Sequence, residues 1–274
     1  MFKTRLLSGI LLVIIALFTV ISGGPILFAT IAAISLIGMN ELYKVFKIEK
    51  KATGICGYFI AILYFAVIYV KTTGMVEEAA ALTMLMGIIM VFVIALMAIM
   101  VFGYPKHHPS EIMAAFFGVF YVAVMLSYVY QTRMLPQDGI FTVWLVFVCS
   151  WGCDTMAYCV GVLFGKHKMA PVLSPKKSIE GGVGGVVGAA LIGVLYALAI
   201  NKWGGAGVDV LSYAIIGAVG GAISQVGDLS ASAIKRQCGI KDYGTLIPGH
   251  GGILDRFDSV IFTAPIIYYL AILL

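Results

Sequence analysis

Long apolar segments, separated by short polar ones, make up most of this chain. They fall at residues 6–22, 25–39, 54–70, 79–102, 111–129, 139–163, 183–200, 210–227 and 259–274. A helix needs roughly 20 apolar residues to cross the hydrocarbon core of a bilayer. The pattern therefore predicts an all-α fold, a polytopic integral membrane helical bundle with about nine transmembrane helices.

The first two apolar segments are short and lie close together. Gly23, Gly24 and Pro25 predict a tight turn between them, so they could form a tilted hairpin or a re-entrant pair. The first segment follows the basic residues Lys3 and Arg5, as the apolar region of a signal peptide would. Its apolar run is long, however, and no A-x-A cleavage site follows it, so we expect a retained first helix.

The basic residues predict how the helices are oriented. If the N-terminus is cytoplasmic, only Lys71, Arg133 and Lys202 of the 18 lysines and arginines fall in outside segments. Cytoplasmic loops of membrane proteins are enriched in lysine and arginine. We therefore expect a cytoplasmic N-terminus. We also expect a single membrane domain, in which residues 1–130 supply N-terminal helices and residues 131–274 supply C-terminal helices that carry the candidate functional site on the cytoplasmic face.

Composition supports the membrane assignment and excludes other classes. The 274 residues are 61% hydrophobic and 11% charged, with a mean hydropathy of +1.04. A soluble domain usually carries about 25% charged residues. The net charge of +5 is mostly a topology signal, so we expect no nucleic-acid partner, although it could gather anionic lipid at the inner leaflet. The five cysteines show no zinc-type spacing and are interpreted as ordinary thiols.

Three carboxylates near the C-terminus are candidate metal ligands. Asp255 and Asp258, in "LDRFD", would share one face of a helix, and Asp228 follows an apolar segment at the membrane border. Mg²⁺ prefers oxygen ligands and usually binds one or two carboxylates together with substrate phosphates. The alternatives are acidic residues that begin an ordinary helix, and a cap on a cytoplasmic helix extension.

Basic and hydroxyl side chains gather in the same loops. The first group lies around the carboxylates and comprises Lys235, Arg236, Lys241 and Arg256. The second lies in "SPKKSIEG" and comprises Ser174, Lys176, Lys177 and Ser178. Carboxylates that hold a metal, cations that neutralise phosphate and exposed backbone amides are what phosphoryl or nucleotidyl transfer requires. Any one lysine alone could be only a positive-inside anchor.

Three further polar residues stand out. His250, in "PGHGG", could be a general base, a phosphate donor or a loop-shaping residue. Asp154 lies within an apolar segment, where an ionisable group is a functional candidate by default. We expect it to face the bundle interior and to pair with a basic group or line a polar site; the alternative is a hydrogen bond that joins two helices. Glu180 could orient a lysine or contact a ribose or base.

The glycines of "GGVGGVVGAALIG" have the four-residue spacing of close helix packing, but the first of them could also leave backbone N–H groups for phosphate.

The segment from Ser232 to Asp258, "SAIKRQCGIKDYGTLIPGHGGILDRFD", resembles the signature of the phosphatidate cytidylyltransferase family, the CDP-diacylglycerol synthases. We call it the signature segment. It covers 27 residues, about a tenth of the chain, and is highly specific. "SPKKSIEG" and "CDTMAYCVGVLFGKHK" resemble the same family, although Met156 stands where members often have glycine. The N-terminal half matches only as generic membrane helices.

The resemblance implies transfer of CMP from CTP to phosphatidate, giving CDP-diacylglycerol and pyrophosphate in phospholipid biosynthesis. It implies that Asp228, Asp255 and Asp258 bind Mg²⁺, alone or together with a second cation such as K⁺, and that Lys235 and Arg256 act with them. It further implies substrate-binding roles for Ser174, Lys176, Lys177, Ser178, Glu180, Arg236, Lys241, His250 and Asp154. We expect membrane lipid around the chain, a bacterial inner-membrane location, an active site on the cytoplasmic side and a possible homodimer.

Two other functions are compatible with parts of the sequence. A CTP-dependent polyprenol or lipid kinase would share parts of the site but would transfer the γ-phosphoryl group. An ion-coupled transporter could also bury carboxylates and break helices with glycine. The complete "HGGILDRFD" motif favours cytidylyl transfer over the kinase. The lack of a repeat between the two halves of the sequence argues against the transporter.

Overall fold

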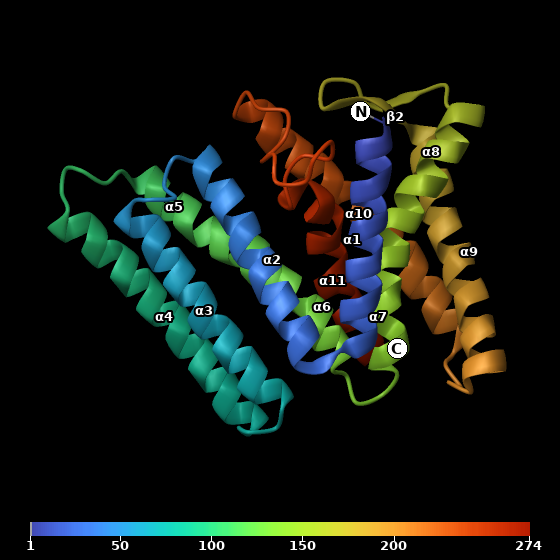
Figure 1. The fold of residues 1–274 in the computed structure, drawn as a ribbon, viewed down its shortest axis with the longest axis horizontal. Coiled ribbons are helices and arrows are strands. Elements are labelled where there is room, and N and C mark those ends of the chain that lie inside the picture. Colours follow the sequence, from blue (N-terminus) through green and yellow to red (C-terminus); the bar gives the residue numbers. More distant parts are fainter. Residues whose placement is uncertain (1) are drawn as a thin grey trace. The chain divides into compact units, whose positions relative to one another are not determined.

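The structure, a computed structural model, describes residues 2–274, with side chains described from residue 7 on. Helices account for nearly all regular structure, so the all-α prediction is confirmed (Figure 1). The helices are α1 (Phe2–Ser22), α2 (Gly24–Val45), α3 (Ala52–Thr72), α4 (Glu78–Phe102), α5 (Pro109–Gly118), α6 (Met125–Arg133), α7 (Gly139–Phe147), α8 (Cys153–Phe164), α9 (Ile179–Gly204), α10 (Val210–Gln237) and α11 (Leu254–Leu273).

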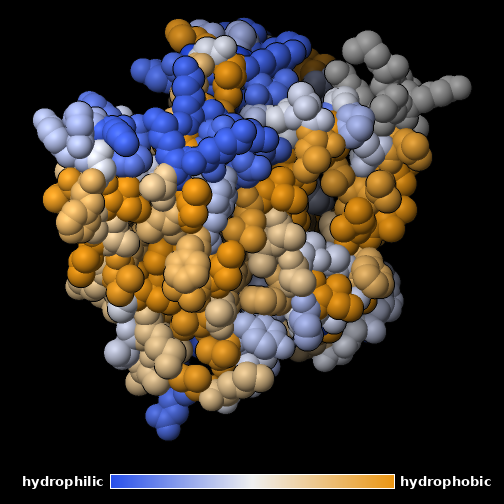
Figure 2. Space-filling model, turned by 60° about the vertical axis from the view of Figure 1, so that its left-hand side comes forward, coloured by the Kyte–Doolittle hydropathy of each residue, from blue (hydrophilic) through white to orange (hydrophobic). Residues whose placement is uncertain are grey.

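In the described part of the chain, eight helices are long and apolar enough to cross a membrane. A ninth apolar helix, Leu7–Ser22, is shorter. The number is close to the nine expected, and the protein is an integral membrane protein. On the face drawn in Figure 2, hydrophobic residues cover the sides of the helices and hydrophilic residues gather at their ends.

Two of the membrane-crossing helices contain a π-helical insert. The first is η1 (Val119–Val124), between α5 and α6, and the second is η2 (Val148–Gly152), between α7 and α8. A π-helical turn adds a residue per turn and changes the direction in which the following side chains point. Insert η2 ends two residues before Asp154, so it determines which way this carboxylate faces.

The chain divides into two compact units. Unit 1 comprises the residues up to Gln131 together with Tyr243–Asp255, and unit 2 comprises Thr132–Asp242 and Arg256–Leu274. Unit 1 therefore combines the N-terminal helices with most of the loop that precedes α11. Aromatic side chains fill part of its interior, including Phe28, whose ring centroid lies 5.3 Å from that of the fully buried Tyr130.

Unit 2 is held together by close packing of α8, α9 and α10. A Cβ atom on Gly185 would lie 2.9 Å from the Cys153 sulfur, and one on Gly217 would lie 2.7 Å from the Ala189 carbonyl oxygen. These helices approach so closely that glycine is required at both positions. The glycine-rich face of α9 is therefore used for packing within the chain.

The loop expected between residues 164 and 182 contains a small hairpin. Strand β1 (Lys168–Ala170) pairs antiparallel with β2 (Ser174–Ser178). Ser178 then caps α9, because its hydroxyl oxygen accepts a hydrogen bond from Gly181 N over 3.1 Å. The hairpin thus fixes the two lysines of β2 directly before the start of α9.

Candidate active site

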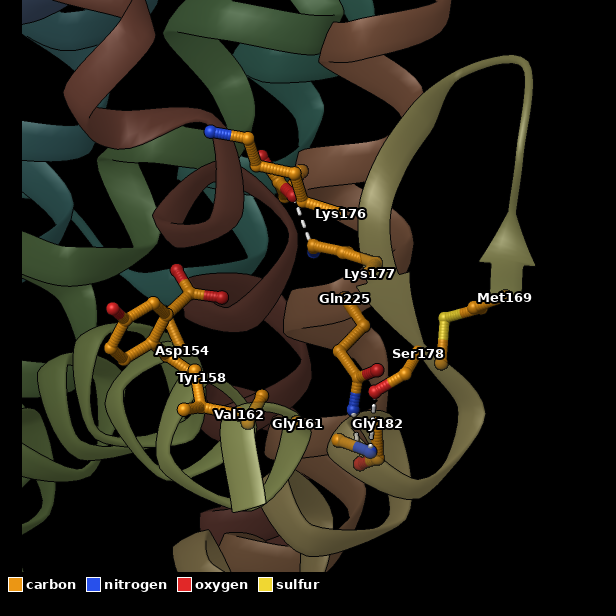
Figure 3. A pocket seen from close by; sticks show the side chains of 13 residues that line it. Asp154, Tyr158, Gly161, Val162, Met169, Lys176, Lys177, Ser178, Gly182 and Gln225 are labelled. Carbon is orange, nitrogen blue, oxygen red and sulfur yellow. Dashed lines mark hydrogen bonds and ion pairs between the residues drawn. The ribbon is translucent and has the colours of Figure 1, made fainter. Parts of the chain in front are cut away.

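Unit 2 contains a pocket of about 440 Å³ at the end of α9 where the hairpin lies. We call it the polar pocket because four charged side chains line it. Figure 3 shows Asp154 and Tyr158 of α8 on one side and Lys176, Lys177 and Ser178 of β2 on the other. Other lining residues include Met169, Gly182, Gln225 and Asp228. The pocket therefore brings together two segments that lie apart in the sequence, "CDTMAYC" and "SPKKSIEG".

An ion pair joins the two sides of this pocket. Lys177 Nζ contacts Asp228 Oδ2, and both side chains are only about one quarter exposed, at 24% and 27%. Asp154 interacts electrostatically with both of these groups. A pair this sheltered holds its charges because each compensates the other, and loss of one partner would leave the other uncompensated.

Asp258 is the third carboxylate of this group. It is 8% exposed, and its Oδ1 accepts a hydrogen bond from Ser259 N over 2.8 Å. Its charge interacts with those of Asp228, Lys235 and Asp154. Unit 2 thus gathers Asp154, Asp228 and Asp258, with Lys177 and Lys235 as compensating cations. We call Asp154, Asp228 and Asp258 the acidic group.

The acidic group bears on the predicted metal site. No cluster of three or more histidine, cysteine, aspartate or glutamate side chains among residues 7–274 is arranged to hold a metal ion by itself. Mg²⁺ usually takes only one or two carboxylates and completes its coordination with water and substrate phosphates. Three neighbouring carboxylates with two lysines suit such an ion chemically, and Mg²⁺ binding stays a prediction.

Asp255 has a different setting, in unit 1. It is 7% exposed, and its Oδ2 accepts hydrogen bonds from Tyr243 N over 2.8 Å and from Gly252 N over 3.0 Å. These contacts fold the signature segment onto the start of α11. Asp255 therefore organises the loop that precedes Asp258, and its role as a metal ligand stays a prediction.

Glu41 of α2 is a residue that the sequence interpretation missed. Its side chain is buried, and its carboxylate accepts hydrogen bonds from Ile253 N over 3.0 Å and from Leu254 N over 2.8 Å. A negative charge is favourable at a helix N-terminus, where backbone N–H groups lack partners. Glu41 thus caps α11 from a position 212 residues earlier in the chain.

Two glycines of the signature segment make room for this carboxylate. A Cβ atom on Gly244 would lie 2.6 Å from Glu41 Oε1, and one on Gly252 would lie 2.5 Å from Glu41 Oε2. Either side chain would displace the glutamate. The Glu41 carboxylate therefore explains why the signature segment has glycine at positions 244 and 252. A charged residue shortly after the end of an apolar segment, in "MNELYK", was the only sequence signal that could have indicated its role.

His250 contacts the N-terminal helix within unit 1. Its Nδ1 lies 2.9 Å from Ser8 Oγ, and the same hydroxyl donates to the Pro248 carbonyl oxygen over 3.1 Å. The histidine therefore fastens the signature segment to α1. This arrangement agrees with the loop-shaping alternative, and a role in substrate binding stays a prediction.

The remaining predicted cations lie in unit 2. Lys235 and Arg236 are in the last turn of α10, and Arg236 donates to the Ile240 carbonyl oxygen over 3.4 Å. Lys241 is exposed. Arg256 has a buried Nε without a hydrogen-bond partner among the described residues. A buried N–H donor normally has a partner, so Arg256 is a candidate to bind an anionic ligand.

Glu180 fixes the hairpin. Its carboxylate accepts hydrogen bonds from Lys166 N and His167 N, at 3.1 and 3.2 Å, and its Oε1 lies 2.6 Å from His167 Nδ1. It therefore orients the strand pair that carries Lys176 and Lys177. Ser174 begins β2 and is half-buried. Contact of Glu180 with a nucleotide stays a prediction.

Comparison with known proteins identifies the family. The model of the cytidylyltransferase family matches residues 3–274, nearly the whole chain. The chain belongs to the cytidylyltransferase family. It is therefore a nucleotidyltransferase, and the resemblance of the signature segment to this family is confirmed.

Individual relatives of this cytidylyltransferase carry a common name. Proteins called phosphatidate cytidylyltransferase from Staphylococcus epidermidis and Staphylococcus haemolyticus are 34% and 32% identical to it. Each match covers 98% of this chain and 99% of the relative. A protein of the same name from a Synechocystis species is 30% identical, over 98% of this chain and 96% of its own length.

Proposed function

We propose that this cytidylyltransferase transfers CMP from CTP to phosphatidate, giving CDP-diacylglycerol and pyrophosphate. The observation that carries the proposal is the polar pocket of unit 2, in which Lys176, Lys177, Asp154 and Asp228 meet among membrane-crossing helices. A phosphorylated lipid and a nucleotide both need cations at the end of such helices. The names of the relatives support the choice of phosphatidate as acceptor.

The reaction is a displacement at the α-phosphorus of CTP. An oxygen of the lipid phosphate forms the new P–O bond, the bond between the α-phosphorus and the bridging oxygen breaks, and pyrophosphate leaves with that electron pair. A phosphate monoester is mostly ionised at neutral pH, because its second pKa is about 6. The acceptor therefore needs no general base, and His250 is not required for proton transfer.

The chain's own cations would hold the reacting phosphates. Lys176 is exposed at the pocket, and Lys177 is paired with Asp228. A substrate phosphate, which carries more negative charge, would compete with Asp228 for Lys177. Arg256 offers its buried N–H group. The buried Arg256 donor is fixed before the substrates bind, so it stabilises negative charge on a phosphate with little reorganisation. Lys177 must instead exchange Asp228 for a phosphate.

Mg²⁺ is the cofactor we propose. Asp228 and Asp258 would hold it, together with Asp255, as the family resemblance implies, or with Asp154 of the acidic group. When bound, the ion would neutralise charge on the α-phosphate and on the leaving pyrophosphate. A second cation such as K⁺ is part of the same proposal.

The location of the protein belongs to this proposal as well. The lysine and arginine asymmetry and the bacterial relatives support the bacterial cytoplasmic (inner) membrane, with the active site on the cytoplasmic side, where CTP is available. The homodimer stays a prediction, and the glycine face that suggested it packs within the chain.

Labelled CTP tests the proposed function. Purified protein is incubated with Mg²⁺, phosphatidate and CTP labelled at either the α- or the γ-phosphorus, and the lipid is extracted. We expect label in the lipid only from α-labelled CTP. Label from γ-labelled CTP would identify a lipid kinase, and no transfer of either label would refute the proposal.

A matched pair of variants links this reaction to the acidic group. Asp258→Asn removes one buried charge at nearly constant volume and should abolish transfer. Asp209→Asn makes the same change in an exposed residue that caps the N-terminus of α10 through Ser212, and asparagine also caps helices well. The control variant should keep full activity. Retained turnover in Asp258→Asn would remove this residue from the site.

A further inference from the structure

An apolar groove adjoins the polar pocket of unit 2. It has a volume of about 430 Å³ and lies between α9 and α10. Its walls come from Ile179 to Val187 on α9 and from Ala222 to Leu229 on α10. Val183, Val187 and Val226 are each about half exposed or more, so the groove is open on the side that faces lipid.

The groove and the polar pocket are continuous. Met169, Gly182 and Gln225 line both of them, and Figure 3 shows these three residues together at one end of the polar pocket. Gln225 Nε2 donates to the Gly182 carbonyl oxygen over 2.8 Å, which spans the junction between α10 and α9. A Cβ atom on residue 182 would collide with Met169 Cε, so glycine leaves room at this junction.

We propose that this groove holds one acyl chain of the glycerolipid whose phosphate binds in the polar pocket. The inference rests on the proposed function and identifies where its lipid substrate lies. One continuous site offers lysines at one end and only aliphatic side chains beyond Gln225. This change from cationic to apolar surface matches a phosphorylated glycerolipid, whose charged head group continues directly into hydrocarbon.

The dimensions fit a chain segment that enters from the bilayer. Nine residues of α9, from Ile179 to Val187, extend over about 12 Å at about 1.5 Å per residue. This is less than half of the roughly 30 Å hydrocarbon core. The groove therefore accommodates the part of the chain nearest to the head group, while the rest of the chain stays among bulk lipid.

The groove orients the lipid more than it strengthens binding. Lipid tails are as apolar as the valines that line the groove, so moving a chain from the bilayer into it gains little hydrophobic free energy. What the groove supplies is a fixed direction of approach for the phosphate. A bulky side chain there should act by excluding long chains from this path.

A second apolar groove does not share this property. It lies in unit 1, is lined by residues such as Val93, Met97 and Phe117, and has no charged residue in its lining. Nothing there would bind the head group of a phosphorylated lipid. This groove therefore serves as an internal reference for non-specific contact with lipid.

Two tryptophan variants of α9 test the proposal. Val183→Trp fills the groove one residue after Gly182, whereas Leu195→Trp places the same side chain about 18 Å further along α9 by helical rise. The two native residues are similarly exposed, at 60% and 65%. Initial rates with α-labelled CTP are measured with dioleoyl phosphatidate and with dihexanoyl phosphatidate, whose chains are too short to fill the groove.

We expect Val183→Trp to lower kcat/KM for the dioleoyl substrate at least 10-fold and to change it less than 2-fold for the dihexanoyl substrate. Leu195→Trp should change neither value more than 2-fold. An unchanged rate of Val183→Trp with the dioleoyl substrate would overturn the proposal. An equal loss on both substrates would also overturn it, because the variant would then act on the polar pocket alone.

Photo-cross-linking of the unmodified protein gives a second test that needs no activity. Phosphatidate with a diazirine in the first half of one acyl chain is irradiated with the protein, and labelled peptides are identified by mass spectrometry. We expect the label on Ile179–Val187 or Ala222–Leu229. Labelling confined to the second apolar groove, in unit 1, or no labelling of α9 and α10, would overturn the inference.

These measurements separate the two proposals. If the unmodified protein transfers no α-label to either lipid, the proposed function fails, and the cross-linking result still decides whether the groove binds lipid. If transfer is normal but the groove variants and the cross-links behave otherwise than expected, only the assignment of the groove fails.

Discussion

The cap that Glu41 forms on α11 can be tested by removing its two acceptor atoms in steps. Glu41→Ala deletes the whole carboxylate, which leaves Ile253 N and Leu254 N without their partner. Glu41→Gln keeps one carbonyl oxygen but turns an NH₂ group towards the other backbone N–H. The native carboxylate is 5% exposed, so water replaces it poorly in either variant.

The hydrogen bonds set the expected magnitude. A hydrogen bond to a charged group contributes about 1.5–3 kcal/mol, and both bonds are short, at 2.8 and 3.0 Å. We therefore expect Glu41→Ala to lower the free energy of unfolding by about 3–6 kcal/mol. Glu41→Gln should lose about half of this, because one acceptor survives while the charge at the helix N-terminus disappears.

The assay is thermal unfolding in detergent, with the same scan rate for every variant because membrane proteins often unfold irreversibly. The matched control is Glu77→Ala, since Glu77 is exposed and its side chain caps no N–H group of α4. The expected order of apparent Tm is unmodified protein and Glu77→Ala first, then Glu41→Gln, then Glu41→Ala. If the apparent Tm of Glu41→Ala matched those of the unmodified protein and Glu77→Ala, the cap would not stabilise α11.

Four further outcomes are expected. Asp228→Asn should lower the rate of CMP transfer about 100-fold or more, the scale of losing one group that stabilises charge in a transition state, with normal membrane insertion as the control for folding. Gly252→Ala should lower the apparent Tm because its Cβ would lie 2.5 Å from Glu41 Oε2, and combining it with Glu41→Ala should add little. EDTA should stop CMP transfer and excess Mg²⁺ should restore it; transfer that continues in EDTA would contradict the metal proposal. Lys71→Gln removes an ion pair to the exposed Glu78, so activity should change less than 2-fold, and a large loss would contradict the predicted topology.

The membrane helices could be predicted because their signal is local. Each one needs a run of apolar residues, and such runs are visible in the sequence without knowledge of their neighbours. Helix α2 shows the limit of this reasoning. The apolar segment was expected to end at residue 39, yet α2 continues to Val45, through Asn40 and Glu41. The helix continues because the Glu41 charge is compensated by backbone N–H groups far along the chain.

The candidate site was predictable in its residue types but not in its partners. The sequence indicated that Asp228, Asp258, Lys176 and Lys177 belong to one chemistry, and the structure brings Lys177 onto Asp228. The sequence also marked Asp154 as a candidate site residue, but it could not show which carboxylates and cations Asp154 would meet. That depends on insert η2, because one extra residue in a turn changes which face of the helix Asp154 occupies. No propensity for π-helix is strong enough to be recognised in "VCSWG".

In two parts of the chain, the sequence does not show whether a glycine allows close packing or exposes backbone N–H groups to a phosphate. In α9, glycines allow helices to approach, as Gly185 does against Cys153. In the signature segment, Gly244 and Gly252 leave space for a carboxylate from α2. Both patterns look like backbone exposed for phosphate when only the sequence is known. The distinction depends on which distant side chain fills the space, so mutating the glycine and its neighbour together separates the cases. A glycine that binds phosphate would lose activity whether or not Glu41 is present, whereas one that accommodates Glu41 should tolerate alanine once Glu41 is shortened.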